Sequence, residues 1–153
     1  MQTRPDSAET CITARAAVVR APKPAYGVRV TAPATVAERF NDAITHRDID
    51  GLATLMSDDH RFIDTEDSTV SGKQACLAAW RGFFESFPDY RNVFTSFSTR
   101  GEVVVIVGRS ECSEPALAGP ALWTATIVGD QVAEWHVHDD TPETRKHLGL
   151  PAN

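Results

Sequence analysis

The sequence lacks the common motifs that bind nucleotides or activate a serine. It contains no G-x-G-x-x-G stretch, no G-x-x-x-x-G-K-[ST] loop and no G-x-S-x-G elbow. Lysine and arginine form no run, and the formal net charge is −6. Binding to nucleic acid by counterion release has no basic patch to act through. We therefore expect no nucleotide or other cofactor and no nucleic-acid partner.

Long apolar runs and paired cysteines are also missing. No apolar segment approaches the roughly 20 residues that a membrane-spanning helix needs. The three cysteines, Cys11, Cys76 and Cys112, are widely spaced and fit neither a disulfide framework nor the spacing of a zinc site. We therefore expect a cytoplasmic protein that has no membrane partner and holds no metal.

The remaining composition is that of a globular protein. The chain has 153 residues, of which 42% are hydrophobic, so it is long enough to bury a sizeable core. Charge divides it, because residues 1–32 carry a net charge of +3 and the remainder carries −9. The first segment also includes the proline-rich stretch APKPAYG. We expect residues 1–32 to form a flexible or packing arm and residues 33–153 to form one domain.

The first half of this domain has helical periodicity, and the second half alternates as strands do. Helices are expected over the apolar repeat that starts at Val36, after a cap at Asp48, and after a capping box that begins at Ser71. Strands are expected in HRFIDTE and at 90–97, 103–111, 121–128 and 132–138, before a last helix capped by Thr141. This order predicts an α+β domain with helices on one face of a curved sheet and a cavity between them.

Three stretches carry a family resemblance: RFNDAITHRDIDGLATLMSDDHRFIDT, SGKQACLAAWRGFFESFPDYR, and ALWTATIVGDQVAEWHVHDD followed by LGLP. Over residues 34–151 their order resembles the SnoaL-like branch of the nuclear-transport-factor-2-like superfamily. The resemblance implies a cone-shaped α+β fold, in which a curved antiparallel or mixed sheet with helices on its concave face encloses one pocket. It also implies a homodimer. The superfamily includes polyketide cyclases, ketosteroid isomerases, dehydratases, epoxide hydrolases and non-catalytic binding modules, so function has to be argued from the site.

The last expected strand ends in titratable residues. His136, His138 and Asp140 alternate and therefore share one face, which we expect to line the pocket. Trp135 and Val137 would then pack on the opposite face. A histidine beside a carboxylate is a natural proton-transfer pair. The H-x-H spacing has no third ligand nearby, so we expect no metal there.

The resemblance implies a catalytic acid–base aspartate at the end of this strand. Counting back from Leu148 and Gly149 gives Asp140, and counting on from Trp135 gives Asp139, which lies on the other face. We expect Asp140, because it shares a face with both histidines. The alternative is that these carboxylates stabilise the start of the last helix through its dipole.

Asp64 is the second candidate carboxylate. Alternation places Phe62 and Asp64 on one face of their strand, and the resemblance matches Asp64 to the general base of ketosteroid isomerases. A carboxylate on an apolar wall gains basicity by desolvation. The alternative is that Asp64 accepts backbone hydrogen bonds in the turn that follows it.

Other catalytic arrangements in the superfamily fit less well. The tyrosine and aspartic acid of the isomerase oxyanion hole fall on Phe40 and at or near Trp123, which cannot replace them. Arg109 and Glu111 could join Asp140 in a triad like that of the epoxide hydrolases, with a Glu in place of one Asp, although a surface ion pair is the commoner explanation for an R-x-E spacing. Besides the catalytic candidates, the residues expected to bind a ligand are Phe40, Trp80, Phe84, Tyr90, Arg109 and Trp123.

We therefore expect a cofactor-independent acid–base enzyme, a cyclase, isomerase or dehydratase, that acts on a small cyclic or polyketide-like carbonyl compound. The alternatives are a non-catalytic module that binds a hydrophobic small molecule, an epoxide-hydrolase-like enzyme, and a dimerisation domain with an unused pocket.

Overall fold

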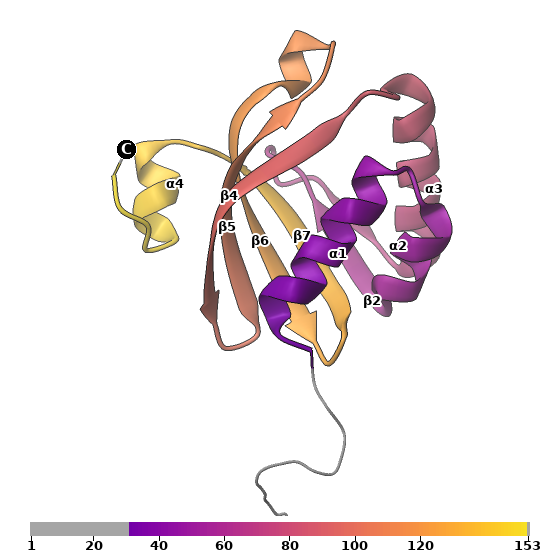
Figure 1. Cartoon of the computed structure of the whole chain (residues 1–153), viewed down its shortest axis with the longest axis horizontal. Coiled ribbons are helices and arrows are strands. Elements are labelled where there is room, and N and C mark those ends of the chain that lie inside the picture. The colour runs from indigo at the N-terminus through magenta and orange to yellow at the C-terminus, as the bar shows by residue number, and fades with distance from the viewer. Residues whose placement is uncertain (1–30, 153) are drawn as a thin grey trace, which may run out of the picture. The chain divides into compact units, whose positions relative to one another are not determined.

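Three helices lie together on the inner side of a bent sheet (Figure 1). The computed structural model describes residues 31–152, so all but the last two residues of the arm expected at 1–32 lie outside the described part. The helices are α1 (Pro33–Thr45), α2 (Ile49–Leu55), α3 (Lys73–Ser86) and α4 (Pro142–His147), with a short 3-10 helix η1 at Pro115–Leu117. None of the helices described within residues 31–152 is long and apolar enough to cross a membrane.

Local sequence explains most of the helix boundaries. Pro33 occupies the first turn of α1, where its missing N–H is not needed. The Asp48 side chain caps α2 by accepting a hydrogen bond from the Gly51 N–H at 2.9 Å, and Thr141 caps α4. The capping box expected at Ser71 is wrong. Ser71 ends a strand instead, and α3 begins after Gly72, which has a φ of 95° and makes no side-chain cap.

The sheet has six strands in the order β3-β2-β7-β6-β5-β4. Their bounds are β2 Met56–Ile63, β3 Thr69–Ser71, β4 Arg91–Arg100, β5 Val103–Glu111, β6 Gly119–Val128 and β7 Gln131–Asp139. The β2–β7 pair is parallel and the other pairs are antiparallel, so the sheet is mixed. Register shifts interrupt the β2–β7, β4–β5 and β6–β7 pairs, and such bulges bend strands.

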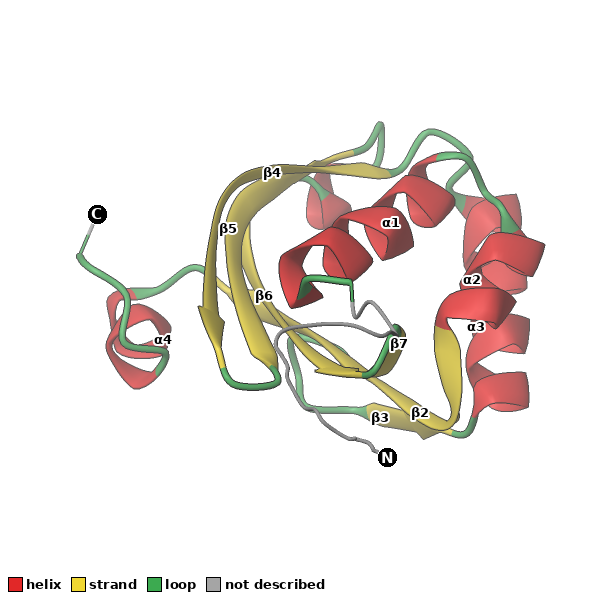
Figure 2. Ribbon diagram, turned by 60° about the horizontal axis from the view of Figure 1, so that its bottom comes forward, coloured by secondary structure: helices red, strands yellow, loops and turns green. Residues whose placement is uncertain are grey.

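The bend wraps the sheet around α1 (Figure 2). Helices α1, α2 and α3 cover the concave side, whereas α4 lies apart from them beyond β4 and β5. The predicted α+β fold with helices on the concave face of a mixed sheet is therefore confirmed for the described residues.

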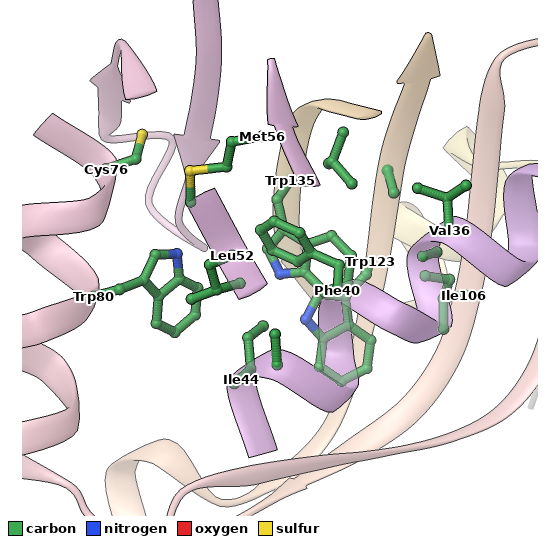
Figure 3. Close-up of a cluster of buried hydrophobic side chains, with 14 of the residues drawn as sticks. Val36, Phe40, Ile44, Leu52, Met56, Cys76, Trp80, Ile106, Trp123 and Trp135 are labelled. Carbon is green, nitrogen blue, oxygen red and sulfur yellow. The ribbon is translucent and has the colours of Figure 1, made fainter. Parts of the chain in front are cut away.

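The core lies between α1 and the concave face. Phe40 of α1 is 4.6 Å from Trp135 between ring centroids, and Phe94 of β4 is 4.9 Å from Trp123. Phe40, Trp123 and Trp135 are completely buried. Figure 3 shows these three rings together at the centre of the cluster, with Trp80 of α3 to one side. Because Trp135 is held here, the side chains two and four residues after it on β7 also point to the concave side.

At Gly108 of β5 the backbone of β4 lies too close for a side chain. A Cβ atom at this position would overlap the Val93 carbonyl oxygen of β4, next to the bulge between Phe94 and Ser96. Gly82, on the exposed side of α3, has open space around it instead. The two glycines therefore differ in whether a methyl group can be accommodated.

We predict that Gly108→Ala lowers the free energy of unfolding by about 1–3 kcal/mol, the usual cost of overpacking. The matched variant Gly82→Ala should raise it by roughly 0.5–1 kcal/mol, because alanine favours a helix interior. Urea denaturation followed by tryptophan fluorescence measures both. Equal stability of Gly108→Ala and the unmodified protein would contradict the close approach of β4 and β5.

Candidate functional site

A cavity of about 540 Å³ opens between α3, the ends of β2 and β7, and the segment around η1. Its walls are mostly apolar and aromatic. The lining side chains that matter below are Phe62, Asp64, Trp80, Phe83, Tyr90, Ser110, Trp135, Val137 and Asp139. A cavity of this size and lining suits a small, flat or cyclic molecule.

Asp64 lines this cavity and is also held by the turn that follows β2. Its Oδ1 atom accepts hydrogen bonds from the backbone N–H groups of Glu66, at 2.9 Å, and Ser68, at 3.0 Å. The turn interaction expected as an alternative is therefore present. Both bonds use the same oxygen, so Oδ2 stays available to a molecule in the cavity. The turn fixes the direction of the carboxylate and does not compete with a role in the site.

Like Glu66, Asp139 also lines the cavity. It is the last residue of β7, follows Trp135 and Val137 on the concave face, and is exposed at the mouth. Ile63 pairs with His136 across the parallel strands β2 and β7, so Asp64 is level with Val137. Asp64 and Asp139 are therefore on adjacent strands and offset by about two residues along them. With usual strand dimensions, their Cα atoms are on the order of 8 Å apart.

The inward orientation expected for His136 and His138 is wrong, since Trp135, Val137 and Asp139 line the cavity. The two imidazole rings stack on the other face of β7, 3.8 Å apart. The His138 Nε2 atom lies 3.0 Å from the Thr124 hydroxyl, and the His136 Nε2 atom lies 3.5 Å from an Asp67 carboxylate oxygen. Burial is the main cause that lowers the pKa of His138 to about 4, and the nearby His136 is the second. His138 is therefore neutral at physiological pH.

Asp140 does not line the cavity either, so its expected position in the pocket is wrong. Its carboxylate accepts two hydrogen bonds from Arg145 of α4, at 2.5 and 2.9 Å, and its side chain is 6% exposed. Arg145 also donates to the Pro151 carbonyl oxygen at 3.1 Å. The Arg145 guanidinium holds the pKa of Asp140 below its usual value. This pair attaches α4 and the residues after it to the end of β7.

The residues expected to bind a ligand separate into three groups. Trp80 and Tyr90 line the cavity. The other aromatic residues of the set, Phe40, Phe84 and Trp123, are buried in the core and do not line it. Arg109 lies on the convex face, where it and Arg91 of β4 both pair with Glu111. The surface ion pair considered for the R-x-E spacing is therefore present, and the position expected for Arg109 at the ligand is wrong.

Buried polar residues that the sequence did not reveal include Ser110 and His60. Ser110 lines the cavity on the concave face of β5, between the two residues of the R-x-E pair. The alternation Val104, Ile106, Gly108, Ser110 contains the signal that could have found it. His60 of β2 is completely buried, and its Nδ1 donates to the Val132 carbonyl oxygen at 2.7 Å. Burial lowers the pKa of His60. Across residues 31–152 no group of three or more His, Cys, Asp and Glu side chains could hold a metal ion.

Known proteins resemble this chain in sequence pattern and in fold. A family model described as a SnoaL-like domain matches residues 37–147. No curated protein matches the sequence. A proposed polyketide cyclase from Sinorhizobium meliloti has a TM-score of 0.62 at 17% identity, over 68% of this chain and 94% of that one.

Two further solved structures are similar. A proposed SnoaL-like polyketide cyclase from Shewanella denitrificans has a TM-score of 0.64 at 18% identity, over 76% of this chain and 96% of that one. An LEH-like epoxide hydrolase from M. tuberculosis has a TM-score of 0.63 at 14% identity, over 76% and 88%. At these identities the likeness shows the fold alone.

We predict that Asp140→Asn destabilises the protein because it removes the charged partner of the mostly buried Arg145. The pKa of Asp140 is depressed in the folded state, so its stabilising contribution is complete above the unfolded pKa, near pH 4, and is lost as the pH falls through the folded pKa. The difference in free energy of unfolding between the two proteins should therefore be constant near neutral pH and shrink in acid. Urea denaturation from pH 7 to pH 3 measures this difference.

Asp139→Asn is the matched control. Among the described residues the Asp139 side chain has no hydrogen-bond or ion-pair partner, so its replacement should leave the melting temperature almost unchanged. A loss of stability at Asp139 as large as that at Asp140 would contradict the assignment of Asp140 as the anchor of α4.

Proposed function

The chain belongs to the SnoaL-like family, and we propose that it is a cofactor-independent acid–base enzyme that acts on a small cyclic or polyketide-like carbonyl compound. The observation that carries the proposal is the pair of aspartates, Asp139 and Asp64, which with Glu66 are the carboxylates that line a mostly apolar and aromatic cavity. Isomerisation, dehydration and ring closure of such compounds share one step, the removal of a proton from a carbon next to a carbonyl group. A positioned carboxylate can take this proton.

Asp139 is the proposed proton acceptor. It follows the buried Trp135 and the partly exposed Val137 on the concave face, so a flat molecule lying on Val137 presents its edge to the carboxylate. Asp64 is the proposed second group. Its turn holds Oδ1 in place, and Oδ2 can bind or return a proton on the neighbouring strand. A separation on the order of 8 Å leaves room for part of a ligand between the two carboxylates.

The arrangement of the other titratable groups supports this choice over an epoxide-hydrolase-like site. Arg109 and Glu111 pair with each other on the convex face, and Asp140 pairs with Arg145. None of these three residues of the proposed triad lines the cavity. We therefore assign the acid–base step to Asp139 and Asp64.

We predict that the protein catalyses hydrogen–deuterium exchange next to the carbonyl group in members of a panel of cyclic ketones and linear diketones, measured by NMR in D₂O. Asp139→Asn should reduce this exchange by about 10²–10⁴-fold, the usual contribution of a general base. The matched control is Asp58→Asn, which makes the same chemical change at an exposed residue of β2 outside the cavity. Its exchange rate should equal that of the unmodified protein.

Two results would contradict the proposal. If Asp139→Asn exchanges as fast as the unmodified protein, Asp139 is not the base. If the unmodified protein binds panel members and exchanges none of them, the cavity is a non-catalytic binding site for hydrophobic molecules, which its apolar lining would also allow.

A further inference from the structure

A chain of four buried polar side chains leads from the cavity to α1. The Tyr90 hydroxyl lies 3.3 Å from the Ser110 hydroxyl, and Ser110 donates to Oδ1 of Asn92 at 2.8 Å. Asn92 donates its amide to Oδ1 of Asn41 at 3.3 Å. Asn41 in turn donates to the Asn92 carbonyl oxygen at 3.1 Å. All four residues are less than 10% exposed, and Tyr90 and Ser110 line the cavity.

The backbone carbonyl at the far end determines the direction of every bond in this chain. A carbonyl oxygen only accepts, so Asn41 must present its amide nitrogen there and its Oδ1 to Asn92. Asn92 must then present its own Oδ1 to Ser110, which has to be the donor. The one proton of the Ser110 hydroxyl is used in this bond. Ser110 can therefore only accept from Tyr90.

The Tyr90 hydroxyl is consequently the hydrogen-bond donor at the cavity end of this series of hydrogen bonds. Its present partner is Ser110 at 3.3 Å, longer than the usual 2.7–2.8 Å or so of an O–H···O bond. An acceptor on a ligand that comes closer would be a better partner. Phe83 meets the Tyr90 ring edge-on at 4.8 Å and fixes its direction. Burial raises the pKa of Tyr90, so the hydroxyl keeps its proton at neutral pH.

The hydroxyl end lies away from the carboxylates. Asp139 pairs with Ala121, and Ala121 pairs with Gly108, two residues before Ser110. Two strand spacings separate β7 from β5, which places Ser110 on the order of 10 Å from Asp139. A carbonyl group bound at Tyr90 is therefore remote from the carbon that reacts at Asp139.

We propose that the Tyr90 hydroxyl, which exchanges its long bond to Ser110 for a bond to the ligand, is a recognition site for a second carbonyl oxygen of the ligand, remote from the reacting carbon. This proposal rests on the proposed function, because it extends the substrate class to flat compounds with oxygen functions at two ends. A hydrocarbon body would lie along Trp80 and Val137 between the two polar ends.

Two probes that differ only at the carbonyl group test this site: 1-tetralone, a bicyclic ketone, and tetralin, in which a CH₂ group replaces C=O. The unmodified protein should bind 1-tetralone about fivefold more tightly than tetralin, as one neutral hydrogen bond provides. Tyr90→Phe should bind both equally and keep its affinity for tetralin. Quenching of tryptophan fluorescence measures the affinities, and the melting temperature confirms that the variant is folded.

Infrared difference spectra of bound 1-tetralone labelled with ¹³C at the carbonyl provide a second measurement that a change in packing alone would not move. The carbonyl stretch should shift to lower frequency in the unmodified protein and should lose this shift in Tyr90→Phe. The matched control is Trp80→Phe, which removes lining area and leaves the hydroxyl in place. It should weaken binding of both probes and preserve their ratio.

The proposal is overturned if Tyr90→Phe keeps the preference for 1-tetralone or the infrared shift, or if the unmodified protein binds neither probe or shows no preference. These measurements need no turnover, so they separate the two proposals. A preference for the ketone without any exchange activity would support the recognition site and contradict the proposed enzymatic activity. Exchange that depends on Asp139, with equal binding of both probes, would support the enzymatic activity and contradict the recognition site.

Discussion

The burial of Trp135 determines which residues of β7 reach the cavity. Its indole ring is completely buried against Phe40 of α1 and is 6.1 Å from Phe94 of β4 between ring centroids. Burying an indole ring on the concave face stabilises the fold more than burying the imidazole of either neighbouring histidine there would. Because side chains alternate along a strand, Trp135 brings Asp139 to the cavity mouth and sends His136 and His138 to the convex face.

The same constraint explains what the sequence could predict and where it failed. Helical and alternating patterns, turn residues and the family landmarks were sufficient for the fold, because each is a local signal repeated along the chain. Alternation also correctly grouped His136, His138 and Asp140 apart from Trp135 and Val137. It does not say which group faces inward. The sequence analysis predicted that the titratable residues face the cavity. The large Trp135 side chain faces the concave side instead, because its burial stabilises the fold more.

Other parts of the site depend on contacts between distant positions, which no local pattern contains. Asn41 and Asn92 are 51 residues apart, and Ser110 follows Asn92 by 18. Each of them alone looks like a surface residue. For Asp140 the partner is only five residues away, but the pair forms because α4 turns back on the end of β7. Counting residues back from Leu148 and Gly149, as the family resemblance suggested, selected Asp140. Counting on from Trp135 selected Asp139, which the structure places at the cavity.

The two ends of the cavity differ in how rigidly their polar groups are held, and the difference matches the roles proposed for them. A buried polar group that loses its partner costs about 1–3 kcal/mol, so the bonds between Ser110, Asn92 and Asn41 keep their geometry whether or not a ligand is bound. The Tyr90 ring is held by Phe83, so its hydroxyl can select a ligand by the position of one oxygen atom. Asp139 is exposed and has no such network among the described residues, which leaves its carboxylate free to approach and leave a carbon-bound proton. A molecule held firmly at the Tyr90 end and loosely at the Asp139 end would be positioned by the first group and transformed by the second. Selectivity and proton transfer would then depend on separate residues and could change independently during evolution.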